Sequence, residues 1–535
     1  MTDNSQGKQA NYDVAIVGAG PGGIMIAVAL KEKLGLHNIM IYDKTTDFGG
    51  TWLDNSYPGS ASDTPAHFYV PSTHLNPRWT TTFPPQTELL AYWRDLASSY
   101  TLYLNSAFHT RVVGATWNHT TQRYDIDVED ARTGERRQEH ARFVVSAVGL
   151  VSEPRYPEAT KGIGSNGSSV FEGTGGCWHS ARWRHDVDFH GQRVAVIGNS
   201  ASAAQFVPCL AADPTTRVTN FGRTPNWFVY GPRHRYPPAL RWVLAHIPFA
   251  TRLFRLVVIL INYARPIRSE LCQRLKSGGK EGREADLIAY MKRTAPVKYH
   301  QELTPQYSLH CRRPILDAGY YACLHKPNVE LNWKSVSEVT KTGLLLEDGT
   351  EETFDVIILS TGFITGRSLF DVRGEDGVTL DDFYKSEGRP IAHRGVCVPG
   401  FPNFFLIAGP NTVTRNGSAI LTHEVAVDYI VQLLAPLVRR PALTLRVPRA
   451  AFHTFNAAMS ADLAKSVLVS AACPPSWFRA DGGTGLNFST WPGSIYGFWW
   501  AMRRVRWEEY EVTDAQGRVV EVGRRTKWRE ALGWH

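Results

Sequence analysis

Residues 12–30 read YDVAIVGAGPGGIMIAVAL, and residues 192–207 read QRVAVIGNSASAAQFV. In each stretch a short apolar run leads into a glycine-containing turn and then into an apolar segment with helical spacing. A strand, a glycine-rich turn and a helix in this order form a unit that binds a dinucleotide, with its phosphates at the helix N-terminus. The chain is therefore predicted to be an α/β protein with two Rossmann-like dinucleotide-binding domains. Two dinucleotides in one protein indicate redox chemistry between them.

The first turn meets the physical requirements of such a site. Gly18 permits the tight turn, Gly20 lets the backbone approach a pyrophosphate, and Gly23 allows close packing of the helix. Asp43 ends the next apolar run and would accept hydrogen bonds from a ribose diol. Gly49-Gly50 would let the backbone lie against another flat or anionic part of the ligand. We predict FAD here, because the second unit supplies a separate place for a nicotinamide nucleotide.

The second turn departs from the GxGxxG pattern, but only toward small residues. The residues expected to hold its pyrophosphate are Gly198, Asn199, Ser200, Ala201, Ser202 and Ala203. The next strand places Arg223 and Thr224 where a protein that binds NAD would carry an acidic residue. An arginine and a hydroxyl bind a 2′-phosphate, which a carboxylate would repel, so the pattern favours NADPH. The alternative is that Arg223 is only a surface cation.

The bulk composition describes a globular protein of two or three domains. The chain has 535 residues and a formal charge of +8, which suits anionic cofactors and equally a solvated basic surface. Its seven cysteines form no CxxC, so we expect no disulfide framework and a reducing, cytoplasmic compartment. The most membrane-like stretch, Leu253–Ala264, is shorter than the ~20 residues of a spanning helix, so no membrane span is predicted. No metal site is predicted.

The order of segments predicts how the two domains share the chain. Residues 1–150 and 385–535 would form the FAD-binding domain, and residues 151–228 and 305–384 the NADP-binding domain. Residues 229–304 are rich in arginine, have few strand signals, and are predicted to be a helical insertion in the second domain. A basic amphipathic subdomain with a solvated face is the simpler interpretation of this insertion, and peripheral membrane contact is the alternative.

Three further apolar runs are predicted to be buried strands. They are Arg142–Gly149, Phe354–Phe363 and Pro402–Pro410, the last entering a loop and then a helix from about Ser418.

A longer motif identifies a family. Residues 49–63, GGTWLDNSYPGSASD, match the fingerprint GxWxxxxYPGxxxD through Gly50, Trp52, Tyr57 and Asp63. In this the chain resembles the type I Baeyer–Villiger monooxygenases, of the class B flavoprotein monooxygenase group. The segments GRTPNW, CRRPILDAGYYACLHKPNVEL and FPNFFLIAGPNT also look like family segments, and their order covers nearly the whole chain.

The linker between the domains departs from the family pattern FxGxxxHxxxW. It reads FEGTGGCWHSARWR over residues 171–184, so two extra residues separate Phe171 from the matching Gly175. Arg184 also stands where the family usually has proline or aspartate. This insertion puts in question how the motions of the two domains are coupled, more than the catalytic chemistry itself. His179 is either a functional linker residue or a satisfied loop histidine.

The resemblance implies an FAD-containing, NADPH-dependent enzyme that inserts one atom of O2 next to a ketone carbonyl. The product would be an ester or lactone, formed through a C4a-peroxyflavin. Arg313 would be the catalytic cation, because an arginine holds an anion without losing a proton, and Asp63 would pair with it. The alternative for Arg313 is a structural ion pair.

The resemblance also implies which side chains hold the cofactors. Besides the residues of the first turn and Asp43, those expected at FAD are Gly50, Thr51, Trp52, Asp63, Tyr69, Val112 and Ala419. Besides the second turn, those expected at NADPH are Gln205, Arg223, Thr224, Arg312 and Trp477. Ala419 would begin a helix whose amide end favours the reduced, anionic flavin.

Two questions stay open in the sequence. The nearest other activity is that of a flavin monooxygenase acting on nitrogen or sulfur, and the ketone could be linear, cyclic or aryl. The tryptophan-rich residues 489–507 either line a pocket or fill a core. The expected partners are the small-molecule ketone and O2, with no nucleic acid, and the protein is expected to be a monomer.

Overall fold

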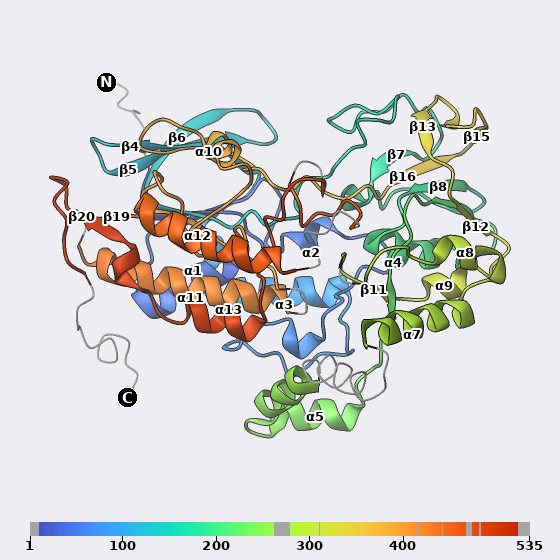
Figure 1. The fold of residues 1–535 in the computed structure, drawn as a ribbon, viewed down its shortest axis with the longest axis horizontal. Coiled ribbons are helices and arrows are strands. Elements are labelled where there is room, and N and C mark those ends of the chain that lie inside the picture. The colour runs from blue at the N-terminus through green and yellow to red at the C-terminus, as the bar shows by residue number, and fades with distance from the viewer. Residues whose placement is uncertain are drawn as a thin grey trace, which may run out of the picture.

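The computed structural model describes residues 10–261, 279–309, 311–414, 417–440, 442–466, 473–480 and 483–522. Figure 1 shows two α/β units side by side, each with its own sheet and helices, and a smaller helical projection at the lower edge of the view. The predicted fold class, an α/β protein with two Rossmann-like units, is confirmed.

The first unit is built on a large mixed sheet. Its strand order is β17-β4-β5-β6-β1-β2-β3, and β18 pairs with β6 beyond the end of β5. β1 runs parallel to β2 and β6, with Val14 opposite both Ile39 and Phe143, whereas β4, β5 and β6 are antiparallel. The strands are β1 (Asn11–Val17), β2 (Ile39–Tyr42), β3 (Ser106–Ala107), β4 (Thr110–Asn118), β5 (Arg123–Asp130), β6 (Arg136–Ser146), β17 (Asp371–Arg373) and β18 (Phe404–Leu406).

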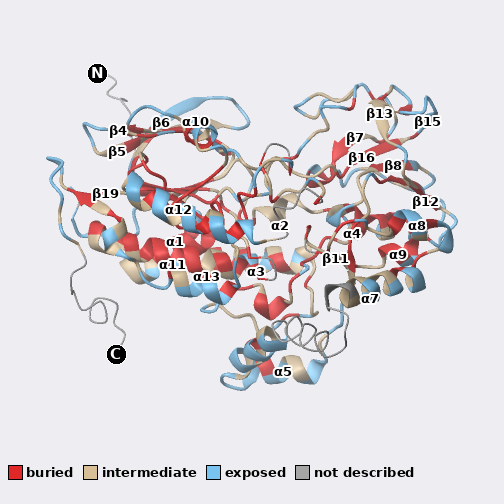
Figure 2. Cartoon of the chain, in the orientation of Figure 1, coloured by how far each residue is buried: buried red, intermediate tan, exposed pale blue. Residues whose placement is uncertain are grey.

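Two apolar helices cover this sheet. The first ten residues of α1 (Pro21–Leu34) are all buried, because the helix lies between β1 and α11 (Ala419–Val438). α13 (Ile495–Met502) packs against the outer side of α11. Figure 2 shows the buried residues concentrated along these helices and the strands behind them. The other helices of this unit are α2 (Thr51–Asp54), α3 (Gln86–Ser99), α10 (Leu380–Ser386) and α12 (Arg449–Ala464), beside the β19–β20 pair (Thr444–Arg446, Glu511–Thr513).

The second unit has a fully parallel sheet in the order β12-β9-β8-β16-β7. Its strands are β7 (Gly176–His179), β8 (Arg193–Ile197), β9 (Arg217–Phe221), β12 (Val329–Asn332) and β16 (Val356–Leu359). Val356–Leu359 is buried throughout, as expected for a central strand covered on both faces. Helices α4 (Ala201–Leu210) and α9 (Tyr320–Cys323) cover one face, and a meander covers the other: β13 (Val336–Val339), β14 (Gly343–Leu346) and β15 (Glu351–Thr353).

The two units repeat one turn geometry. Gly18 and Gly198 both have φ +110°, in a region that disfavours residues with a side chain. A Cβ on Gly18 would lie 2.6 Å from the carbonyl oxygen of Ala147, and one on Gly198 would lie 2.3 Å from that of Ser360. Each glycine therefore lets its turn pass close to the end of the neighbouring parallel strand.

One predicted domain boundary is wrong. Residues 371–373 were expected in the NADP-binding domain, yet β17 pairs with β4 of the first sheet. Phe370, Phe383 and Tyr384 also belong to the hydrophobic core of the first unit. The chain thus returns to the first unit before residue 384, through an edge strand too short to show a period in the sequence.

Where the structure describes it, the arginine-rich insertion (residues 229–304) is mainly helical, but its helices pack in two separate places. α7 (Gly279–Thr294) and α8 (His300–Leu303) pack on the second unit, through Met291 and Leu303 among others. Short strands β10 (Phe228–Tyr230) and β11 (Ile315–Asp317) pair beside them. Only α5 (Pro238–His246) and the helix of residues 250–261 form the lower projection in Figure 1. Arg265, Arg268 and the end of the run to Ala264 lie outside the described residues.

Among the described residues, α11 is the one unbroken helix long and apolar enough to cross a membrane, and 61% of its apolar 18-residue window is buried inside the protein. Its place between α1 and α13 makes it a core helix. α5 and the helix of residues 250–261 pass the same test only when taken together, and they are bent by 119° at their junction.

Candidate functional site

The N-termini of three helices point to anion binding. α1, α4 and α11 start after Gly20, Ser200 and Ser418, and none of the three has a side-chain hydrogen bond capping its first turn. Uncapped first-turn amides and the positive end of the helix dipole favour phosphate and other anionic groups. The first two helices carry the predicted pyrophosphate turns, and α11 begins at Ala419 as predicted.

Asp43 is fixed beside the first turn. Its Oδ2 accepts a hydrogen bond from the Ala19 amide at 2.7 Å, and its Oδ1 accepts from the amide and hydroxyl of Thr45 at 2.9 and 2.7 Å. A carboxylate oxygen can accept more than one hydrogen bond, so the carboxylate keeps capacity for a ribose hydroxyl.

The fingerprint segment closes over the first turn. The Gly49 amide donates to the Ala19 carbonyl at 3.1 Å, and a Cβ on Gly20 would stand 3.4 Å from the Cα of Gly50. α2 then begins at Thr51, and the buried Trp52 meets Tyr69 edge to face at 5.6 Å between ring centroids. These contacts bring the predicted FAD residues of the fingerprint close to the first turn.

Polar atoms near the start of α11 fit a bound polar group. The hydroxyls of Thr414 and Ser418 are buried and have no hydrogen-bond partner within the described chain. Gly22 of α1 faces the same helix, because a Cβ there would lie 3.8 Å from Nδ1 of His423. Since buried hydroxyls are normally hydrogen-bonded, this end of α11 suits the polar edge of a ligand such as flavin. Val112, also predicted at FAD, is buried in β4 beside a register shift.

Three arginines from separate segments gather at the second turn. Burial lowers the pKa of Arg155, and the charge of Arg223 lowers it further. Burial likewise lowers the pKa of Arg312, and Arg223 again adds to the effect. Arg312 is tied to the second turn through the Asn226 side chain, which accepts from Arg312 and donates to the Asn199 carbonyl, both at 3.3 Å, so these positive charges suit an anion such as a 2′-phosphate. Arg155 was not predicted, and its only sequence signal is its place in SEPRYP, before the second unit.

Two other residues predicted at NADPH, Asn199 of the second turn and Gln205 of α4, are held by hydrogen bonds. The Asn199 side chain donates to the Thr224 carbonyl at 3.1 Å, which ties the turn to the loop after β9. Gln205 of α4 donates to the Ala61 carbonyl and accepts from the Tyr57 hydroxyl, both at 3.0 Å. Gln205 thus joins the fingerprint segment of the first unit to the second unit.

Arg313 and Asp63 form the predicted pair. Nη2 of Arg313 donates to Oδ1 of Asp63 at 2.9 Å and lies 3.4 Å from the Thr64 hydroxyl. Asp63 comes from the fingerprint of the first unit, and Arg313 from the segment before β11 in the second. Both side chains stay partly exposed, at 34% and 42%, so the pair is accessible to a ligand.

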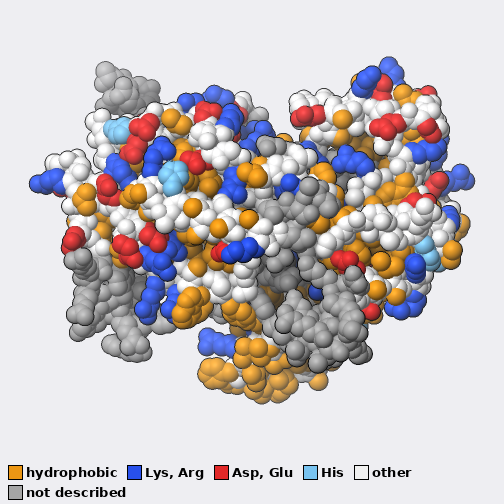
Figure 3. All heavy atoms as spheres, viewed as in Figure 1, with side chains coloured by type: hydrophobic (Ala, Val, Ile, Leu, Met, Phe, Trp, Pro, Cys, Tyr) orange, Lys and Arg blue, Asp and Glu red, His pale blue; other side chains and the backbone are white. Residues whose placement is uncertain are grey.

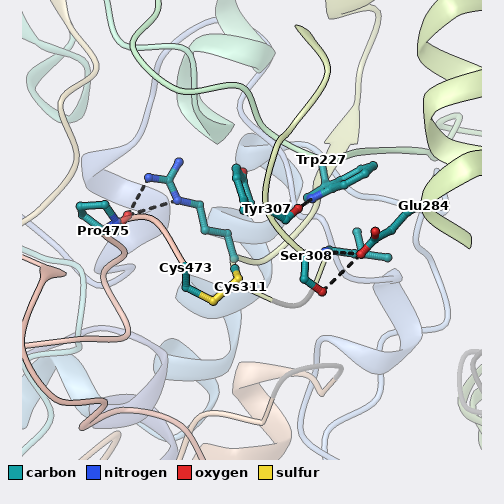
Figure 4. Close-up of a disulfide and its surroundings, with 9 residues drawn as sticks. Trp227, Glu284, Tyr307, Ser308, Cys311, Cys473 and Pro475 are labelled. Atoms are coloured by element: carbon teal, nitrogen blue, oxygen red, sulfur yellow. Dashed lines mark hydrogen bonds between the residues drawn. A yellow bond between two sulfur atoms is a disulfide. The ribbon is translucent and has the colours of Figure 1, made fainter. Parts of the chain in front are cut away.

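A disulfide beside this pair corrects the expectation drawn from the cysteines. Cys311 is bonded to Cys473, as Figure 4 shows, with Pro475 nearby. The guanidinium of Arg312 donates to the Pro475 carbonyl at 3.1 and 2.6 Å. Spacing alone could not show the bond, because it depends on two segments 162 residues apart meeting in space. The bridge ties the arginine segment to the segment that carries Trp477, which is half-buried against Phe478.

The residues of the linker signature make packing contacts and hydrogen bonds of ordinary kinds. His179 ends β7, and its Nδ1 accepts the Ala181 amide at 3.1 Å. Burial lowers the pKa of His179 to about 4, so its ring is neutral at pH 7. Trp183 packs against Phe206 of α4, while Arg184 pairs with Asp186 at the surface. His179 is thus held through Nδ1, while its buried Nε2 has no hydrogen-bond partner among the described residues, so the description as a satisfied loop histidine fits only one side of the ring.

The tryptophan-rich segment, residues 489–507, is partly buried in the core and partly exposed. Ile495, Phe498 and Met502 of α13 are buried in the core, and Trp491 packs on Phe498. Trp499 and Trp500 are instead exposed on the other side of the helix, so neither predicted role covers the whole segment.

Several known proteins are similar to this chain over most of its length. A family model described as an NAD(P)-binding Rossmann-like domain matches residues 16–93. A Baeyer–Villiger monooxygenase of Streptomyces coelicolor is 34% identical over 505 residues, covering 93% of this chain and 92% of that protein. The FAD-binding monooxygenase ktnD of Aspergillus niger is 30% identical, covering 95% and 84%. The crystal structure of OTEMO in complex with FAD and NADP superposes with a TM-score of 0.80 at 21% identity, covering 95% of this chain and all of that one.

Proposed function

The chain belongs to the family of FAD- and NADPH-dependent Baeyer–Villiger monooxygenases, and from this premise we propose that Arg313 stabilises the negative charge that arises during oxygen transfer to a ketone. The ion pair between Arg313 and Asp63 is the observation that carries this proposal. It brings one residue from each nucleotide-binding unit to the same place, where the two cofactors must cooperate.

When bound and reduced, FAD activates O2, so that one oxygen atom is inserted beside the ketone carbonyl to give an ester or lactone and the other leaves as water. The Arg313 guanidinium contributes a positive charge and a planar fork of hydrogen-bond donors. Asp63 holds that guanidinium in a fixed orientation, so little reorganisation is needed when negative charge develops.

The cofactor-binding residues divide between the two units. The first turn, Asp43 and the fingerprint residues would hold FAD, with the start of α11 at its polar edge. The second turn would hold the NADPH pyrophosphate, and Arg155, Arg223 and Arg312 would bind its 2′-phosphate. To test the activity, NADPH consumption by the purified enzyme is followed with and without a panel of linear, cyclic and aryl ketones, with products identified by mass spectrometry.

We expect Arg223→Ala to raise the KM for NADPH by about tenfold or more, because hydrogen bonds to a charged group contribute about 1.5–3 kcal/mol. The KM for NADH, which lacks the 2′-phosphate, should change little. Arg155→Ala should act in the same direction. Steady-state kinetics with both coenzymes measure this, with Arg193→Ala as the control, since Arg193 pairs with Asp355 at the far end of β8. Equal effects on the two coenzymes would mean that the 2′-phosphate is bound elsewhere.

We expect Cys473→Ser to reduce the free energy of unfolding by about 2–4 kcal/mol, because the bridge closes a long loop in the unfolded chain. The KM for NADPH should rise as well, since Arg312 follows Cys311 and donates to Pro475. Thermal unfolding and coenzyme kinetics are compared with Cys209→Ser, which removes an exposed free thiol. Unchanged stability and KM, in the variant and after dithiothreitol, would show that the bridge has neither role.

We also propose that the enzyme works as a cytoplasmic monomer. Cys177, Cys209, Cys323 and Cys397 are free thiols, as is usual in a reducing compartment, whereas the Cys311–Cys473 bridge is of a kind more usual in an oxidising one. Analytical ultracentrifugation should give a single species near the chain mass of 59.8 kDa.

A further inference from the structure

The helical projection concentrates exposed hydrophobic side chains in one short segment of the described chain. Twenty-one large hydrophobic side chains are exposed among the described residues, and nine of them lie within residues 242–261. Single exposed hydrophobic residues are normal on a protein surface, whereas a contiguous group marks an interaction site. Figure 3 shows this group as the cluster of hydrophobic side chains at the lower edge of the molecule.

The exposed residues lie along one side of the second helix, whereas α5 buries only Leu244. In the helix of residues 250–261, Leu253, Leu256 and Leu260 follow the spacing of one helical face and are 62%, 50% and 53% exposed. Trp242 of α5 is 58% exposed, and Phe249, at the tip between the helices, is 75% exposed. We call this surface the hairpin face, defined by Trp242, Ile247, Phe249, Leu253, Leu256 and Leu260.

The opposite side of the hairpin is anchored to the first unit. Arg255 is buried, and its guanidinium donates to the Val70 carbonyl at 2.6 Å. The rings of Tyr236 and Phe254 both pack on His67, at 5.6 and 5.0 Å between centroids. The Tyr236 amide also donates to the Thr80 carbonyl at 2.9 Å. The hairpin is therefore fixed at its base, and the hairpin face points outward. The base contacts residues 67–80, the segment that also contains Tyr69, which is predicted at the flavin.

The charged side chains of the segment that carries the hairpin face have a single sign. Residues 232–261 contain five arginines and two histidines and no aspartate, glutamate or lysine. Arg252 is exposed within the hairpin face itself, and Arg235 is exposed near its base. A hydrophobic face combined with basic residues suits the surface of a membrane that contains anionic lipid.

We propose that the hairpin face docks the enzyme on an anionic phospholipid membrane, lying in the interface without crossing it. Within the described residues neither helix reaches the ~20 residues needed to span, and the 119° bend prevents them from acting as one rod. A second copy of the chain is a poorer occupant. A symmetric contact would bring the same arginines together with no carboxylate from residues 232–261 to neutralise them.

The test is co-sedimentation of the FAD-loaded enzyme with vesicles of phosphatidylcholine alone or mixed with phosphatidylglycerol. We expect binding to the mixed vesicles, with weaker binding to pure phosphatidylcholine and at high salt. The double variant Phe249→Ser, Leu253→Ser should bind at least about tenfold more weakly, because it removes two large hydrophobic side chains from the interface. Arg252→Glu should weaken binding to the anionic vesicles by about fivefold or more.

Matched controls separate docking from loss of folding. Leu104→Ser and Val297→Ser remove other exposed hydrophobic residues, at 84% and 81% exposure, and should leave vesicle binding unchanged. All variants should keep their bound FAD and their thermal unfolding temperature. The proposal is overturned if the wild-type enzyme stays in the supernatant with anionic vesicles, or if the double variant sediments as well as the wild type. It is also overturned if the double variant only converts a dimer to a monomer.

Discussion

Replacing Arg313 with alanine should abolish ester formation while leaving flavin reduction by NADPH intact. The variant loses the cation paired with Asp63 at 2.9 Å, but keeps both nucleotide turns. Removing one preorganised group that stabilises a developing negative charge typically lowers kcat about 10²–10³-fold. We therefore expect ester formation to fall by at least that factor, with the NADPH consumed appearing as hydrogen peroxide.

Rapid-mixing absorbance of the flavin, together with product analysis by mass spectrometry, separates the two steps. Arg313→Lys should recover only part of the activity, because lysine keeps the charge but not the planar fork that faces Asp63. Arg193→Ala, in an exposed pair on the far end of β8, serves as the matched control. Ester formation near the wild-type rate in Arg313→Ala would remove Arg313 from its proposed role.

Replacing Gly20 with valine should prevent FAD from binding while the protein still folds. The backbone at Gly20 has φ −76°, which any residue can adopt, and a Cβ there meets only Gly50, at 3.4 Å. The added methyl groups would fill the space beside the α1 N-terminus that a pyrophosphate needs. Loss of even one hydrogen bond to a charged group costs about 1.5–3 kcal/mol, so FAD affinity should fall at least about tenfold.

The FAD content of the purified variant is measured by absorbance, and its folding by circular dichroism. Gly35→Ala is the control, since Gly35 ends α1 with nothing within 4 Å of an added Cβ. It should cost about 1 kcal/mol of stability, because Gly35 has φ +63°, but should retain FAD. A Gly20→Val protein that purified with a full complement of FAD would contradict the placement of the pyrophosphate.

The sequence predicted those features that short-range chemistry determines. A buried run, a glycine that must reach φ +110° and a following helix are local requirements, so both nucleotide turns were predictable. The Arg313–Asp63 pair was predictable for another reason: each residue lies in a long family motif, and the pairing came from the resemblance.

Features that depend on distant segments meeting in space were not predictable. The Cys311–Cys473 bridge and the approach of Arg155 to Arg223 each join segments with no shared local pattern. The three residues of β17 are too few to show alternation, so their place in the first sheet was missed. The few strand signals indicated a helical insertion over residues 229–304, but only the anchoring through Arg255 and Tyr236 to the first unit determines which side of residues 238–261 faces outward.

The most direct test of the account is to supply the wild-type enzyme with NADPH, a ketone panel and ¹⁸O₂, and to analyse the products by mass spectrometry. The account predicts an ester or lactone that carries one ¹⁸O atom per molecule, formed only when FAD is bound. Oxygenation confined to amines or sulfides, with every ketone recovered unchanged, would contradict it.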